Sequence, residues 1–169
     1  MIHSSRLHIF PLTQHELQLM LDNITLFETQ KHLVYDGELL DTELSQIMEG
    51  QITIINQDPN HWLWHTFWLI VDQESRIVGS LCFKGPAIDE TVEIGYGIGQ
   101  KYRSMGYTTE AVKATCQWAL TQQGVNKVIA ETENNNLASR RVLEKAGFMF
   151  SHVKGEFSWW LFEDHSRTE

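Results

Sequence analysis

The segment at residues 98–111, IGQKYRSMGYTTEA, constrains the fold most, because it passes from an apolar strand through a short polar loop directly into a helix. A helix that begins so abruptly leaves its first N–H groups unpaired, with the positive end of the helix dipole behind them. An anion, above all a pyrophosphate, is the natural occupant, and glycine at 106 lets the backbone approach it closely. The segment contains neither GxxxxGK[ST] nor GxGxxG, so it is not one of those nucleotide-binding loops. The alternative interpretation is an ordinary turn between a strand and a helix.

Apolar periodicity and turn residues divide the remainder of the chain into further elements. Strands are predicted at residues 6–11, 66–71, 76–84, 91–98, 128–132, 148–153 and 157–162. Helices are predicted after Thr13, which forms an [ST]xxE capping box with Glu16, and at 108–123 and 136–146. One more helix is indicated by Leu39, Leu40, Leu44, Ile47 and Met48. This order predicts an α+β fold, a mixed sheet with helices on its faces, and the length of 169 residues predicts a single domain over 1–169.

The charge balance limits the partners. Asp and Glu number 22 against 13 Lys and Arg, which gives a net charge of −9, and no basic run occurs. Binding to nucleic acid needs clustered Lys and Arg, so nucleic acid is not expected as a partner. An acidic protein suits a cationic acceptor such as an amine, although many cytosolic proteins are simply acidic.

Nothing in the sequence predicts a membrane span, a secretory signal or a metal site. The longest apolar stretch, at residues 62–71, is too short to cross a bilayer. Cys82 and Cys116 are two lone thiols without CxxC spacing, which fits a reducing compartment and makes the cytoplasm the expected location. His61 and His65 have the spacing of metal ligands on a helix, but their region is interpreted as extended, so no metal is expected.

A second segment, at residues 130–148, carries clear signals for both ends of a helix. An asparagine at 135 or 136 caps the start, and Gly147 is placed to adopt the left-handed conformation after the end. Phe148 is then expected to fold back onto Leu143 in a Schellman motif.

These two segments together resemble the GNAT superfamily of N-acetyltransferases. Arg103-x-x-Gly106-x-Thr108 resembles the [Q/R]xxGx[G/A] signature, with threonine in the last position. Three further segments resemble the RimJ/RimL-like branch, which contains the ribosomal-protein N-terminal acetyltransferases. They are Asn136-x-x-Ser139 followed by residues 143–148, the opening at residues 6–13, and residues 93–96. The resemblance implies a GNAT-type mixed, mainly antiparallel sheet of about seven strands flanked by about four helices.

The resemblance also implies that acetyl-coenzyme A lies in a V-shaped split between two central strands. The backbone of Tyr96, Gly97 and Ile98 would pair with the pantetheine amides, and Asn136 would reach the pantetheine arm from the other side. The pyrophosphate would be held by the amides of Ser104, Met105, Gly106, Tyr107, Thr108 and Thr109. Arg103 precedes this loop, either as an additional charge or as a solvated surface residue.

Three residues are candidates for catalysis. Glu93 and Glu131 lie on the two strands expected to part around the thioester, in runs that are otherwise apolar or rich in glycine. Glu93 is the first choice for the base and Glu131 the second; the alternative is that each is a strand carboxylate facing solvent or an arginine. Many GNAT enzymes have a tyrosine at the position of Leu143 to protonate the leaving thiolate, and Ser139 is the expected substitute here.

The sequence therefore predicts an enzyme that transfers the acetyl group of acetyl-coenzyme A to a primary amine, either a protein N-terminus or a small molecule. Two alternatives stay open: a non-catalytic module that binds coenzyme A, and an acyltransferase with another acyl donor or a hydroxyl acceptor. The expected oligomeric state is a monomer or a homodimer.

Overall fold

A computed structural model describes residues 1–36 and 42–163 of the chain. It contains an eight-stranded sheet in the order β1-β2-β3-β4-β5-β6-β8-β7. The strands are β1 (Ile2–His3), β2 (Leu7–Pro11), β3 (Phe67–Asp72), β4 (Ile77–Phe83), β5 (Thr91–Ile98), β6 (Lys127–Glu133), β7 (Met149–Lys154) and β8 (Phe157–Glu163). The helices are α1 (Gln14–Asp22), α2 (Ile24–Lys31), α3 (Thr42–Gln57), α4 (Trp62–His65), α5 (Tyr107–Leu120) and α6 (Leu137–Ala146), with 3₁₀ turns η1 (Pro59–His61) and η2 (Gln100–Tyr102).

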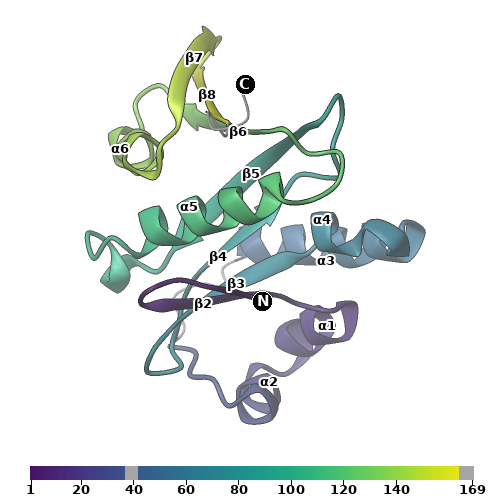
Figure 1. Ribbon diagram of the computed structural model, residues 1–169. Helices are drawn as coiled ribbons and strands as arrows, with labels where there is room; N and C mark the ends of the chain where they lie inside the picture. Colours follow the sequence, from purple (N-terminus) through teal and green to yellow (C-terminus); the bar gives the residue numbers. More distant parts are fainter. Residues whose placement is uncertain (37–41, 164–169) are drawn as a thin grey trace.

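The pairing of the strands confirms a mixed, mainly antiparallel sheet. Every neighbouring pair is antiparallel except β5 and β6, which are parallel and joined by α5. Figure 1 shows α5 crossing the sheet, with α6 and the β7–β8 hairpin at one end of the molecule and α1 and α2 at the other. No helix in the described part of the chain is long and apolar enough to cross a membrane.

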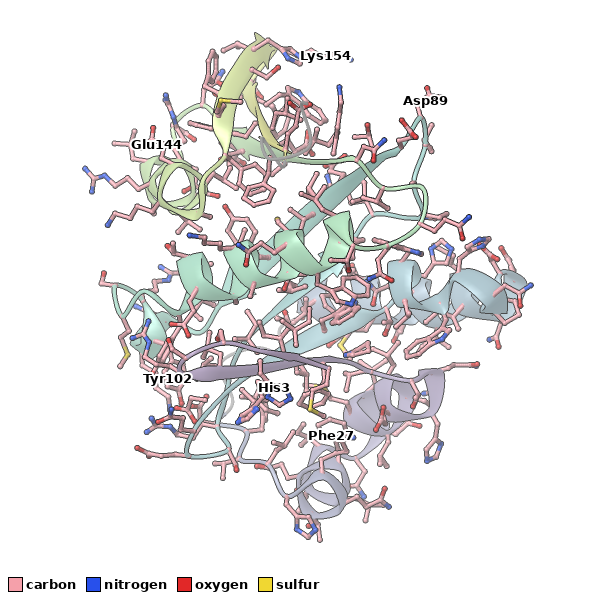
Figure 2. All side chains as sticks on the ribbon, in the orientation of Figure 1. His3, Phe27, Asp89, Tyr102, Glu144 and Lys154 are labelled. Carbon is pink, nitrogen blue, oxygen red and sulfur yellow. The ribbon has the colours of Figure 1, made fainter. Side chains whose placement is uncertain are left out.

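Two apolar clusters cover opposite faces of the sheet because side chains alternate along each strand. Trp68 and Ile70 of β3 join the cluster that packs against α5 and α6, while Phe67 and Leu69 join the cluster beneath α1, α2 and α3. Phe27 belongs to the second cluster and lies at the opposite end of the molecule from Glu144 and Lys154 (Figure 2). The sheet is therefore a layer between two sets of helices.

The parallel pair β5 and β6 is joined only near its start. The registered partners are Thr91–Glu93 of β5 with residues 127–129 of β6. Beyond that point β5 continues in register with β4, and β6 continues with β8. The two strands thus part after Glu93, which leaves one backbone edge of β5 at residues 94–98 without a strand partner among the described residues. This is the split that the resemblance implied.

The described residues contain more elements than the predicted seven strands and four helices. The extra strand is β1, and α2 had not been distinguished within the mixed stretch that follows Asn23. The prediction that residues 61–65 are extended is wrong, because they form the end of η1 and the short helix α4. Pro59 starts this turn, and a helix of one turn is too short to display a 3.6-residue period. Leu39 and Leu40, assigned above to a helix, lie outside the described residues.

The predicted ends of α6 are confirmed. The Asn136 side chain accepts a hydrogen bond from the Ser139 N–H at 3.0 Å, which caps the start of the helix. Gly147 has φ +104°, and the Phe148 N–H bonds back to the Leu143 carbonyl at 2.9 Å. This is a Schellman motif, and the Leu143 side chain is fully buried.

Because of this burial, replacing Leu143 by alanine is expected to lower the free energy of unfolding by about 2–5 kcal/mol. Urea unfolding followed by circular dichroism measures the change. Leu137→Ala is the matched control, because Leu137 lies on the same helix and is 60% exposed, so its truncation should change stability little. Equal losses in the two variants would contradict the role assigned to Leu143.

Candidate functional site

The loop before α5 has the geometry of an anion-binding helix start. Ser104 and Gly106 have φ values of +63° and +80°, and α5 begins at Tyr107 with no side chain capping its first N–H groups. A Cβ added at Gly106 would lie 3.3 Å from Nη2 of Arg6. The first amides of α5 thus have no side-chain partner, and the phosphate-binding role assigned to them stays a prediction. Figure 2 labels Asp89, in the turn before β5, and Tyr102, in η2 between β5 and α5.

Residues 4–6 hold the loop before α5 in place through contacts that the sequence did not predict. Glu110, in the first turn of α5, accepts hydrogen bonds from Ser4 Oγ at 2.8 Å, Ser5 Oγ at 3.0 Å and the Arg6 backbone N–H at 2.8 Å. The Arg6 guanidinium bonds Glu110 through Nε and the Met105 carbonyl through Nη1. It also lies over the Tyr107 ring, 4.8 Å from the centroid. These bonds fix the position of a positive charge beside the loop.

The pKa of Glu110 reflects the same contacts. Burial acts to raise the pKa of this carboxyl, but the hydrogen bonds from Ser4, Arg6 and Ser5 outweigh burial and hold the pKa below its usual value. The carboxylate therefore stays ionised and keeps its bonds to residues 4–6 at neutral pH.

Tyr96 and Ser139 meet on the α5 side of the sheet. The Tyr96 side chain packs against the cluster under α5, and its hydroxyl lies 2.8 Å from Oγ of Ser139 on α6. Burial raises the pKa of Tyr96 to about 12, with the hydrogen bond to Ser139 acting in the opposite direction. The Tyr96 hydroxyl therefore keeps its proton at neutral pH. The sequence placed only the backbone of Tyr96 in the site; the structure adds its side chain.

Glu93 and Glu131 meet on the opposite face of the sheet, at a shared lysine. Lys84, directly after β4, donates a hydrogen bond to Oε1 of Glu131 at 2.8 Å and forms an ion pair with the Glu93 carboxylate. Burial acts to lower the pKa of Lys84, but its hydrogen bonds to Glu131 and Glu93 raise the pKa above its usual value. Lys84 is therefore an ammonium ion that bridges the two strands where they part.

Lys84 carries no sequence signal comparable to the two motifs. It lies beside Glu93 because the Lys84 N–H bonds to the Glu93 carbonyl at 2.9 Å across the β4–β5 hairpin. An opposite-charge pair across the hairpin could have been predicted from the register. The length of the intervening turn, at residues 84–90, left that register undetermined.

The histidines with metal-ligand spacing are paired with an acid instead. His61 Nδ1 lies 2.9 Å from the Asp58 carboxylate, and His65 Nε2 lies 3.0 Å from it. The two histidine contacts lower the pKa of Asp58, with the bond to His65 having the larger effect. Within residues 1–36 and 42–163, no group of His, Cys, Asp and Glu side chains has an arrangement that could hold a metal ion.

The remaining predicted residues border the same region. Gly97 and Ile98 lie on the part of β5 that has no strand partner toward β6, and Asn136 lies at the start of α6. Arg103, Met105 and the first residues of α5 form the loop at the end of β5. The predicted residues therefore lie along one path, from the loop before α5, along the open edge of β5, to the two carboxylates.

Comparison with known proteins identifies the family to which the fold belongs. Residues 6–149 match the model of the acetyltransferase (GNAT) domain. The chain belongs to this family, which transfers acetyl groups from acetyl-coenzyme A.

Individual relatives agree with the family. The Bacillus subtilis protein YjdG, named as an uncharacterized N-acetyltransferase, is 35% identical over 97 residues, or 56% of this chain and 58% of that protein. The match thus spans little more than half the length of this relative. Among solved structures, RimJ of Mycobacterium smegmatis in complex with CoA-disulfide has a TM-score of 0.65 at 16% identity, covering 96% of this chain and 84% of that one. The spermidine N-acetyltransferase of Vibrio cholerae has a TM-score of 0.66 at 12% identity, covering 98% and 100%.

Proposed function

We propose that this protein transfers the acetyl group of acetyl-coenzyme A to a primary amine, by direct attack of the amine on the thioester. The observation that carries the proposal is the parting of β5 and β6 after Glu93, with a carboxylate on each strand. An extended ligand that reaches this point from the loop before α5 would bring its thioester between the two acids.

The residues of the chain fit coenzyme A at each step of that path. The uncapped start of α5 and the positive φ of Gly106 suit a pyrophosphate, and Arg6 adds a fixed positive charge beside them. The open edge of β5 at Tyr96, Gly97 and Ile98 offers backbone groups to the amides of the pantetheine arm. Asn136 lies at the start of α6, the helix that follows β6, and so on the β6 side of the split.

The chemistry of the step needs an acceptor without its extra proton, a polarised carbonyl and a stabilised thiolate. Glu93 or Glu131 takes the proton of the acceptor, directly or through water. Once the neutral nitrogen attacks the carbonyl carbon, the carbon–sulfur bond breaks and its electron pair leaves with the sulfur as a thiolate. The attached nitrogen then gives up its second proton to form the amide, and a proton reaches the thiolate through the hydroxyl groups of the Tyr96–Ser139 pair, so that coenzyme A leaves as the free thiol.

A screen of acceptors tests the proposal. Acetyl-coenzyme A is incubated with the protein and with panels of small primary amines and peptides, and release of free thiol is measured. Transfer to an amine is the expected result. Binding of coenzyme A without turnover on any acceptor would favour a non-catalytic module, and turnover restricted to alcohols or to another acyl-coenzyme A would assign a different acyl transfer.

The Tyr96 hydroxyl is expected to contribute to the rate. Tyr96→Phe keeps the ring and the backbone, so the affinity for coenzyme A should hardly change. A hydrogen bond to a charged group is worth about 1.5–3 kcal/mol, so kcat should fall about tenfold to a hundredfold. Steady-state kinetics at saturating substrates measures this loss.

Ser139→Ala and the double variant provide the matched comparison for Tyr96→Phe. Because the two hydroxyls are bonded to each other, the kcat of the double variant should be little lower than the kcat of the less active single variant. A Tyr96→Phe enzyme with unchanged kcat would remove the hydroxyl from the mechanism.

A further inference from the structure

The ion pairs of Lys84 show how a primary ammonium is held at the split. The Lys84 ammonium contacts carboxylates from two different strands, Glu93 of β5 and Glu131 of β6. These are the residues that the proposed function places around the acceptor nitrogen. The acceptor of that reaction arrives with the same chemical group, so the two ammonium ions need the same oxygens.

We propose that Lys84 is an internal competitor of the acceptor, and thereby a residue that determines which amines are accepted. The inference rests on the proposed function. The ammonium of the acceptor takes the position of the Lys84 ammonium between Glu93 and Glu131, and Lys84 turns out to solvent.

The exposure of the three side chains supports this exchange. The Lys84 side chain is 48% exposed, whereas those of Glu93 and Glu131 are 20% and 29% exposed. The carboxylates therefore lie in a partly buried site, while the more exposed lysine reaches them from outside. Lys84 follows the last residue of β4 and precedes Gly85, which has φ +148°, so it lies where the strand has already ended.

Charge balance explains why the exchange selects cations. With Lys84 in place, two carboxylates face one ammonium, and a neutral acceptor would leave both carboxylates without a partner when it displaced the lysine. A cationic acceptor replaces the lost ion pairs with equivalent ones.

The inference can be tested without catalysis, by letting a free amine bind at the position that the Lys84 ammonium leaves empty in a Lys84→Ala protein. n-Butylamine carries the four carbons and the ammonium of the lysine side chain. It is expected to raise the melting temperature of Lys84→Ala and to bind that variant about five- to tenfold more tightly than it binds the wild type, where Lys84 competes. n-Butanol, which lacks the ammonium, should have no effect on either protein. Adding Glu131→Gln to Lys84→Ala should abolish the response.

A second variant keeps the test decisive if Lys84→Ala folds poorly. Lys84→Met retains a long apolar side chain and removes only the charge, so it should also bind n-butylamine more tightly than the wild type. Equal affinity of n-butylamine for the wild type and for the folded variants would overturn the inference.

Kinetics separates this inference from the proposed function. For an amine that the wild type acetylates, Lys84→Ala should lower the KM of the amine about five- to tenfold and leave the KM of acetyl-coenzyme A unchanged. Transfer by the wild type with the same amine KM in the variant would overturn the role of Lys84 and leave the proposed function standing. Binding of n-butylamine to the variant, with no transfer to any amine by either protein, would overturn the proposed function and leave the ammonium site standing.

Discussion

A Gly106→Asp protein is expected to show no rise in melting temperature with coenzyme A. The wild type should be stabilised by about 2.7 kcal/mol when coenzyme A is present at about a hundred times its dissociation constant. In the variant, a negative charge stands at the start of α5, where the amides and the helix dipole would otherwise attract the phosphates. The new Cβ also approaches Arg6 Nη2 to 3.3 Å, at a φ of +80° that L-residues rarely adopt. Differential scanning fluorimetry with increasing coenzyme A measures the loss.

Gly124→Asp is the matched control for this variant. Gly124 has φ +78°, and a Cβ added there would have nothing within 4 Å. It follows the other end of α5, so the substitution carries a similar backbone penalty and the same charge away from the loop. Its response to coenzyme A should equal that of the wild type. A full response in Gly106→Asp would show that the phosphates bind elsewhere.

Glu93→Gln is expected to lower the rate of acetyl transfer about 10²–10⁴-fold, while the affinity for coenzyme A hardly moves. Glutamine keeps the shape and some hydrogen bonding of the glutamate but cannot take the acceptor's proton. The activity of the parent should rise with pH through one ionisation, and the variant should recover part of its rate at alkaline pH, where more of the acceptor is already neutral. Steady-state rates over a pH series measure both effects.

Glu131→Gln is the control that ranks the two acids, because both bond the same lysine. If the rate of acetyl transfer falls in Glu131→Gln and stays near that of the wild type in Glu93→Gln, the base is Glu131 on β6. If neither variant loses rate, catalysis comes from positioning and from polarisation of the carbonyl, with an already neutral amine selected from solution.

Local signals account for the parts of the fold that were predicted well. The bounds of β5 agree with the prediction because an apolar residue occupies every second position along it. The ends of α6 agree because Asn136 and Gly147 act on their immediate neighbours. The capping box of Thr13 and Glu16 is confirmed for the same reason, with a 2.8 Å bond from the Thr13 N–H to the glutamate.

The contacts that were missed join residues far apart in the chain. Arg6 meets Glu110, and Lys84 meets Glu131, only once β2 and β4 have taken their places in the sheet. The Tyr96 hydroxyl reaches Ser139 for the same reason, since α6 must first pack against α5. Sequence patterns therefore assigned the loop and the two acids to the correct elements, but the partners of those acids follow from the register of the strands.

The open edge of β5 has a consequence for hydrogen exchange. The amides of residues 94–98 that point toward β6 have no strand partner among the described residues, so in the free protein they bond to water and should exchange rapidly. The neighbouring amides that bond to β4 should exchange slowly in the same strand. An extended ligand that carries its own amide groups would satisfy the open edge without moving either strand. The open edge in the middle of the sheet thus offers a preorganised set of backbone groups to one extended ligand.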